Sequence, residues 1–399
     1  MRKIKALSAA GAVLWSSHAF AQTSSYASVL VSSLPEFNGT IPNGGISLYG
    51  SLDEGINYQS VGGKHLFQLQ SGGEWTSKFG MFGREDLGGG LKAEFNLESG
   101  FNASNGNLQA SNTIFNREAW VGLNSTVFGQ VRLGNQIGVG TPLFFDPFGE
   151  VGSNSVVTWL AYAGVQTKSG VGFNTDLGPG GTQVAPRVAN SITWNTPRYA
   201  GFNAEFLYAF NGTAGVSPNA SNQGVLLSWA HGPLYVAATY NRVWSSPVQI
   251  GAAQPLETVR NDLYSFGGVY DCGTFVLDAY VGQYSPHLAG DGIARVYTVG
   301  GILPLGRNVF RVSVVYRDTS GVRDSENIPA KDSAVGMMLG YDYTLSKRTA
   351  LYARAGFIRN YGISTVILNN SPLPTQPGTT VPLTGQTPLT ASVGIYHNF

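Results

Sequence analysis

Residues 309–317, Val-Phe-Arg-Val-Ser-Val-Val-Tyr-Arg, alternate along one predicted β-strand. Successive side chains of a strand point to opposite faces, so this stretch has two faces of different character. The apolar face consists of Phe310, Val312, Val314 and Tyr316, and the other consists of Arg311, Ser313, Val315 and Arg317. Residues 349–357 repeat the pattern, with Leu351, Ala353, Ala355 and Phe357 on one face and Tyr352 and Arg354 on the other. In both strands the charges lie on one face.

Similar alternating segments fill the chain from residue 46 onward, and they are joined in turn by short turns and longer polar loops. Gly, Pro, Asn and Asp mark seven short turns, which join fourteen strands. Residues 46–58 and 391–399 remain, and they can pair with each other to close a ring of about 16 antiparallel strands. The longer connections lie near residues 59–73, 102–112, 137–186, 211–221, 245–260, 285–293, 318–332 and 359–390.

Composition indicates that the ring crosses a membrane. Beyond the N-terminus there is no run of about 18 apolar residues, the length that a membrane-spanning helix needs. A closed barrel is the remaining way to pair every backbone group in lipid. The chain is rich in Gly (53) and aromatic residues (21 Phe, 19 Tyr, 7 Trp), and only 12% of its residues are charged. An arginine facing lipid at mid-depth costs about 2–4 kcal/mol, so the charged face is expected inside, around a wet bore.

The N-terminus predicts export. Basic residues at 2, 3 and 5, an apolar run over 6–15 and the small-residue pattern at 19–21 are typical of a secretory signal. We therefore expect a signal peptide at 1–21, an N-terminal extension at 22–45 and one barrel domain at 46–399 in the bacterial outer membrane. Without Arg2, Lys3 and Lys5, 21 of the 24 basic residues remain against 23 acidic ones. This balance predicts no nucleic-acid partner.

Motifs for chemistry are not found. The histidines outside the signal are scattered rather than set at metal-ligand spacing. There is no Gly-x-Ser-x-Gly motif, and the glycine-rich stretch 178–181 lacks the lysine of a phosphate-binding loop. We expect no enzyme activity, no cofactor and no metal.

Several motifs in order resemble the general diffusion porins of Gram-negative bacteria, in particular those of beta-proteobacteria. They are Ile46-Ser-Leu-Tyr-Gly-Ser-Leu-Asp53, Gly83-Arg-Glu-Asp-Leu-Gly-Gly-Gly-Leu-Lys-Ala93, Phe115-Asn-Arg-Glu-Ala-Trp-Val-Gly-Leu123 and Val393-Gly-Ile-Tyr-His-Asn-Phe399. The resemblance covers residues 46–399. It implies homotrimers of sixteen-stranded barrels, each with a long third loop folded into the lumen. It also implies passive diffusion of ions and small polar solutes, with outer-membrane lipid and lipopolysaccharide around the barrel.

The connection 137–186 is the candidate inward loop, because about 50 residues far exceed an ordinary loop. The resemblance assigns Phe148-Gly149 to the loop tip. Pro147 stands where relatives usually carry a carboxylate, so Asp146 and Glu150 are the candidates for the acidic side of a pore constriction.

The basic side is expected on the opposite wall, where such porins carry a ladder of cations. Four residues fit this role here: Lys78, Arg117, Arg132 and Arg187. Arg84 is a further candidate. The inward position of Arg117 follows from alternation if Trp120 faces outward. Opposed charges across a narrow wet gap create a transverse field that favours polar solutes.

Other readings of the sequence predict different behaviour. A substrate-selective porin would hold a sugar or carboxylate site in the 137–186 loop, and solute-dependent current block would reveal it. A barrel hydrolase would need a nucleophile and base that converge in space, and an adhesin would keep its lumen blocked. A secreted β-sandwich or propeller would show stacked sheets instead of a ring.

Overall fold

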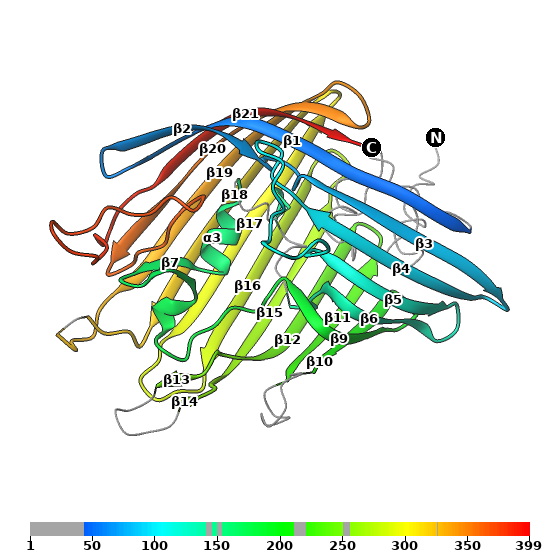
Figure 1. Ribbon diagram of the computed structural model, residues 1–399, viewed down its shortest axis with the longest axis horizontal. Coiled ribbons are helices and arrows are strands. Elements are labelled where there is room, and N and C mark those ends of the chain that lie inside the picture. The colour runs from blue at the N-terminus through cyan, green and yellow to red at the C-terminus, as the bar shows by residue number, and fades with distance from the viewer. Residues whose placement is uncertain (1–43, 141–145, 150–153, 211–220, 250–255, 325) are drawn as a thin grey trace.

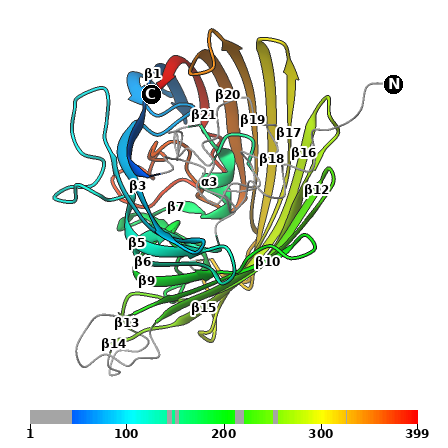
Figure 2. The same cartoon turned by 90° about the vertical axis from the view of Figure 1, so that its right-hand side faces the viewer.

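The computed structural model describes residues 44–140, 146–149, 154–210, 221–249, 256–324 and 326–399. Within them, one antiparallel sheet of seventeen strands curves into a closed ring (Figures 1 and 2). Its strands are β1 (Gly45–Val61), β2 (Lys64–Ser71), β3 (Lys78–Gly88), β4 (Leu91–Gly100), β5 (Glu118–Ser125), β6 (Gly129–Ile137), β9 (Arg187–Asn195), β10 (Phe202–Ala209), β11 (Asn222–His231), β12 (Leu234–Trp244), β15 (Arg260–Asp271), β16 (Val276–Pro286), β17 (Ile293–Leu305), β18 (Asn308–Ser320), β19 (Asp332–Thr344), β20 (Thr349–Gly362) and β21 (Leu389–Asn398).

The first and last strands close the ring. One edge of β1 pairs with β21, from Ser51 opposite Asn398 to Ser60 opposite Leu389. The other edge pairs with β2 in its second half and with β3 in its first half. Because β2 and β3 share one position, the seventeen described strands occupy sixteen positions. The predicted all-β, sixteen-strand antiparallel barrel is confirmed.

The two faces of the wall differ as alternation predicts. On β18, the outward side chains Phe310, Val312, Val314 and Tyr316 are 36–44% exposed. The inward residues Ser313, Val315 and Arg317 are at most 1% exposed. On β20, Leu351 faces outward while Tyr352 and Arg354 are buried inside. The charged face of these strands is therefore the inner face.

The prediction of a long connection at residues 59–73 is wrong, because most of these residues form a β-hairpin. Gly62 and Gly63 both have positive φ, at 56° and 77°, and they form a tight turn between β1 and β2. Two glycines satisfy the left-handed backbone that a two-residue hairpin turn requires. The chain therefore continues as a strand through residues that look like a polar loop.

A second departure from the expected pattern lies in residues 72–77, which we call the strand-two insert. Ser71 pairs with Glu54 and Lys78 pairs with Ser51, so six residues stand opposite two. The buried, inward-facing Asp53 holds the insert. Its carboxylate accepts hydrogen bonds from the backbone N–H groups of residues 73, 74 and 75, at 3.1, 2.7 and 2.7 Å. The hydroxyl of Tyr352 donates to the same carboxylate at 2.8 Å.

The connection between β6 and β9 folds into the barrel, as expected for the third long loop; we call it the inward loop. It contains α3 (Val156–Ala161), the hairpin β7 (Gly164–Thr167) and β8 (Gly170–Phe173), and the 3₁₀ helix η2 (Thr175–Leu177). Figure 2 shows α3 inside the ring. It packs against β17–β20, and an added Cβ at Gly336 would lie 2.6 Å from Leu160. The other described strands, β13 (Val248–Gln249) and β14 (Leu256–Glu257), form a small outer hairpin.

Asp53→Ala should destabilise the barrel by about 3 kcal/mol or more, because a buried donor left without an acceptor costs about 1–3 kcal/mol and three N–H groups lose theirs. Urea unfolding of the reconstituted protein, followed by tryptophan fluorescence, measures the change. Glu85→Ala, at an exposed position on β3, is the control. An Asp53→Ala midpoint equal to that of the control would show that the carboxylate does not hold the insert.

Candidate functional site

The inward loop is fixed to the inner wall by apolar packing and by one buried arginine. Val156, Val157 and Leu160 of α3 are fully buried together with Met338 and Ile358 of the wall. Arg317 of β18 donates hydrogen bonds to both carboxylate oxygens of Asp176 in the loop, at 2.8–3.0 Å. It also donates to Asn174 Oδ1 at 3.0 Å and to the backbone oxygen of Leu160 at 3.3 Å. The loop is thus held at both α3 and η2.

The described part of the loop tip, residues 146–149, lies against the same side of the barrel. Asp146 is fully buried, accepts a hydrogen bond from Ser155 Oγ at 2.5 Å and accepts another from the backbone N–H of Phe148 at 3.1 Å. Cβ atoms added at Gly300 and Gly340 would each lie 2.6 Å from the tip, against Pro147 and Phe148 respectively. The two glycines of the wall therefore let the tip approach β17 and β19 closely.

Four charged residues meet the tip, and we call them the tip cluster: Glu74, Arg311, Asp342 and Arg354. Arg311 lies 2.9 Å from Glu74 and 2.7 Å from Asp342. Arg354 lies 2.6 Å from Asp342 and forms an ion pair with Glu74 as well. Each arginine therefore has two carboxylate partners.

The tip cluster also contacts the inward loop directly. Arg311 donates to the backbone oxygen of Pro147 at 2.5 Å, and the Arg354 guanidinium lies 5.3 Å from the centre of the Phe148 ring. Asn154 of the loop donates to the backbone oxygen of Gly73 in the strand-two insert at 2.8 Å. The insert, the loop tip and the wall thus form one connected structure.

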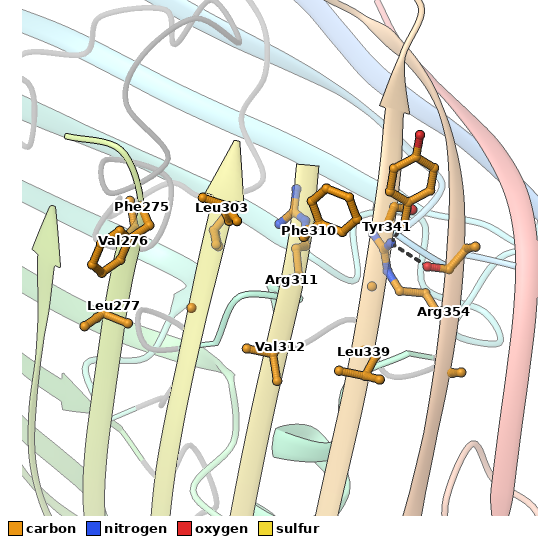
Figure 3. A pocket seen from close by; sticks show the side chains of 15 residues that line it. Phe275, Val276, Leu277, Leu303, Phe310, Arg311, Val312, Leu339, Tyr341 and Arg354 are labelled. Carbon is orange, nitrogen blue, oxygen red and sulfur yellow. Dashed lines mark hydrogen bonds between the residues drawn. The ribbon is translucent and has the colours of Figure 1, made fainter. Parts of the chain in front are cut away.

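Figure 3 shows Arg311 and Arg354 on β18 and β20, on either side of β19. The apolar side chains beside them, including Phe310, Val312 and Leu339, line a groove on the outer face of the wall. This groove faces lipid and is separated from the bore by the sheet.

A second charged group gathers predicted residues around Glu98 of β4. Arg117 lies 2.7 Å from Glu98 and Lys78 lies 3.9 Å from it, and all three are buried. Arg187 lies within electrostatic range of all three. Arg117 stands at the start of β5, and β5 and β17 are eight positions apart in the ring of sixteen. Arg117 therefore projects from the part of the wall opposite β17, whereas Lys78 lies four residues after Glu74 of the tip cluster.

The expectation that Trp120 faces outward is wrong, although β5 alternates regularly, with Val121 and Leu123 on its outer face. Its ring is 3% exposed and packs inside the barrel with Tyr49 and Phe82, and its indole N–H donates to Glu118 at 2.5 Å. Arg117 nonetheless reaches the interior because it precedes the regular ladder of β5.

An extra residue in β9 shifts the register of the strand just after Arg187. The ladder between β6 and β9 shifts next to Asn190, whose φ is 54°, and Val188 rather than Arg187 lies opposite the inward-facing Gln136. Sequence periodicity alone cannot register such a bulge.

The other candidate cations also have carboxylate partners. Arg132 lies 3.3 Å from Glu205, and Arg84 lies 2.6 Å from Glu94 near the short-turn end. Glu150 falls outside the described residues. Sequence alternation correctly predicts that Arg311 and Arg354 face inward. It does not predict their ion pairs with Glu74, because the six-residue insert that contains Glu74 has no periodic pattern.

The described part of the chain contains neither a membrane-spanning helix nor a cluster of metal-ligand side chains. Its helices are too short to span a bilayer. No group of three or more His, Cys, Asp or Glu side chains among these residues has the arrangement of a metal site.

A closed barrel with apolar side chains outside and charged side chains inside defines a water-filled diffusion channel of the outer membrane. The comparisons with known proteins agree. The chain belongs to the Gram-negative porin family, which it matches over residues 6–362.

Relatives of known name cover most of the chain. Outer membrane porin protein 32 of Delftia acidovorans is 30% identical and is matched over 80% of this chain and 86% of its own. An outer membrane porin protein of Bordetella pertussis is 29% identical over 79% of this chain and 89% of its own. Among solved structures, an anion-selective porin from Comamonas acidovorans superposes with a TM-score of 0.70 at 27% identity, covering 89% of this chain and 99% of that one. The chain is thus an outer-membrane porin for ions and small hydrophilic solutes.

Arg317→Met should loosen the inward loop, because removing one partner of a buried ion pair costs about 3–5 kcal/mol and leaves Asp176 uncompensated. We expect noisier open-channel current in single-channel recordings and a lower unfolding midpoint. Arg295→Met, on the exposed outer face of β17, should leave both unchanged. Quiet, wild-type current from Arg317→Met would mean that apolar packing of α3 is sufficient to hold the loop.

Proposed function

We propose that the narrowest part of the channel lies between the inward-loop tip and the Glu98 group, and that it discriminates only weakly between anions and cations. In this proposal Lys78, Arg117, Arg132 and Arg187 form the basic side of the pore. Asp146 and Glu150 belong to the acidic side. Glu74, Arg311, Asp342 and Arg354 complete the constriction next to the tip.

The observation that carries this proposal is charge compensation. Seven inward-facing cations each lie within 4.0 Å of a carboxylate oxygen: Lys78, Arg84, Arg117, Arg132, Arg311, Arg317 and Arg354. Six carboxylates pair with these seven cations; Arg187 adds a further cation to the basic side, and the buried residues Glu118 and Asp146 add further carboxylates. Because cations and carboxylates of the inner wall compensate each other, the electrostatic potential at a permeating ion is small.

The relative from Comamonas acidovorans is described as anion-selective. Shared ancestry favours the same preference here, whereas the compensated charges of this chain favour a much weaker one. We give the charges of this chain more weight, because ion selectivity depends on the side chains that line the pore.

The remaining expectations are part of the same proposal. We infer a homotrimer surrounded by outer-membrane lipid and lipopolysaccharide, a cleaved signal at residues 1–21 and no catalytic turnover. A solved structure of the same fold, from Vibrio cholerae, is described as a trimer form.

Planar-bilayer recording tests the proposal. Stepwise conductance with a reversal potential close to zero in a tenfold KCl gradient is the expected result. A reversal potential near the Nernst value of chloride would instead show strong anion selectivity. Absence of conductance steps would contradict the channel itself.

Glu74→Gln should make the channel more anion-selective. The substitution leaves Arg311 and Arg354 with Asp342 as their remaining carboxylate partner in the tip cluster, a net gain of one positive charge. A unit charge about 4 Å from an aqueous path contributes up to about 1 kcal/mol, so the chloride-to-potassium permeability ratio should rise by up to about fivefold. Reversal potentials in a KCl gradient measure this ratio.

The matched control is Glu257→Gln, which removes the same charge from an exposed outer hairpin. It should leave the ratio nearly unchanged. Equal shifts in both variants would mean that Glu74 is remote from the conduction path.

Arg117→Ala should shift selectivity in the opposite direction. Glu98 would keep Lys78 as a cationic partner, and the basic side would lose one positive charge. The same recording should show a rise in potassium permeability. An unchanged reversal potential would remove Arg117 from the pore lining.

A further inference from the structure

A charged cluster on the outer wall is independent of the bore. Side chains of even number on β12 and β15 face outward, and Tyr264 and Phe266 on this face are 48% and 56% exposed. Arg242 and Arg260 lie at the ends of these strands, where the long connection 245–259 joins them. The cluster is therefore at the long-loop end of the barrel, above an apolar surface.

A buried carboxylate organises the cluster. The side chain of Asp262 is 1% exposed and lies between three basic side chains. Its oxygens accept from Arg260 Nη2 at 2.6 Å, contact His287 Nε2 at 2.8 Å and lie 3.7 Å from Arg242 Nε. Tyr240 adds a further hydrogen bond through its hydroxyl at 3.0 Å.

The basic side chains remain accessible although the carboxylate is covered. Arg242, Arg260 and His287 keep 30%, 33% and 50% of their side-chain surface exposed. Two guanidinium groups around one carboxylate leave a net positive charge, and Asp262 fixes their positions. An arginine has five N–H donors, and one carboxylate cannot accept hydrogen bonds from all ten donors of two arginines.

The surface below the cluster suits a lipid. The rings of Tyr240 and Tyr264 lie 5.2 Å apart at the edge of the apolar surface. Phe266 and Val281, which pair across β15 and β16, continue it toward the membrane centre and are both exposed. Tyrosines of this kind lie at the headgroup level of a bilayer. The order of cations, aromatic rings and apolar side chains matches the order of phosphate, headgroup boundary and acyl chains in an anionic lipid.

We propose that Arg242, Arg260 and His287 bind a phosphate group of lipopolysaccharide, the anionic lipid of the outer leaflet. Asp262 is the positioning residue, and Phe266 and Val281 contact the acyl chains. The proposal rests on the outer-membrane orientation of the barrel, with the long loops outside, and extends the lipopolysaccharide partner of the proposed function to a defined site.

Binding of lipopolysaccharide to the delipidated, detergent-purified protein, measured by native mass spectrometry, tests the site. Each arginine near an anionic lipid surface contributes about fivefold to affinity, so R242Q/R260Q should bind roughly thirtyfold more weakly. Arg307→Gln, an exposed arginine at the short-turn end, is the control and should bind like wild type. Dephosphorylated lipopolysaccharide should bind wild type as weakly as the intact lipid binds the double variant.

Several results would overturn the site. Equal affinity of R242Q/R260Q and wild type is one, and equal affinity for intact and dephosphorylated lipid is another. Full competition by inorganic phosphate at lipid-equivalent concentration would show that a free anion, not the lipid, is recognised.

Single-channel conductance in phospholipid bilayers separates this proposal from the pore. R242Q/R260Q should conduct like wild type, because its side chains lie outside the barrel. Conductance equal to wild type also shows that the double variant folds, so a loss of lipid binding cannot be attributed to misfolding.

Discussion

Closure of the hydrogen-bond ladder between β1 and β21 is the constraint on which the rest of the structure depends. In hydrocarbon no water can satisfy an open strand edge, so the sheet must return to its own first strand. Once it closes, every outward side chain meets lipid and every inward one meets the bore. The alternation of Phe310 and Arg311 then follows from the fold, because their exchange would expose a guanidinium to lipid.

Because the charged face is inside the barrel, its side chains are partly removed from water. Charges partly removed from water are costly unless they are paired and hydrogen-bonded, and the barrel meets this requirement with shared carboxylates. Glu98 forms ion pairs with Lys78 and Arg117. Asp342 and Glu74 both form ion pairs with Arg311 and Arg354. Glu74 belongs to the strand-two insert, so the insert contributes a carboxylate to the interior next to the loop tip.

The sequence predicts what is periodic and misses what interrupts the period. Two-residue alternation identified the barrel, its number of strands and the inward direction of Arg311 and Arg354. The assumption that aromatic rings face lipid failed for Trp120, whose ring packs between other aromatic residues inside. Alternation also could not register the extra residue next to Asn190, which shifts the pairing of β9 with β6. The site depends on such interruptions: the insert, the bulge and the loop tip are each specified by tertiary contacts between residues far apart in the chain.

Three buried aspartates show how the fold positions irregular segments. A carboxylate can accept several hydrogen bonds at once, so a single side chain can fix a segment that has no ladder of its own. Asp53 holds the strand-two insert, Asp176 anchors the inward loop to Arg317, and Asp262 organises the basic cluster on the outer wall. Because the insert and the loop are also bonded to each other through Asn154 and Gly73, neither can move without breaking buried hydrogen bonds. An inward loop fixed in this way keeps a constant shape and charge pattern inside a passive channel.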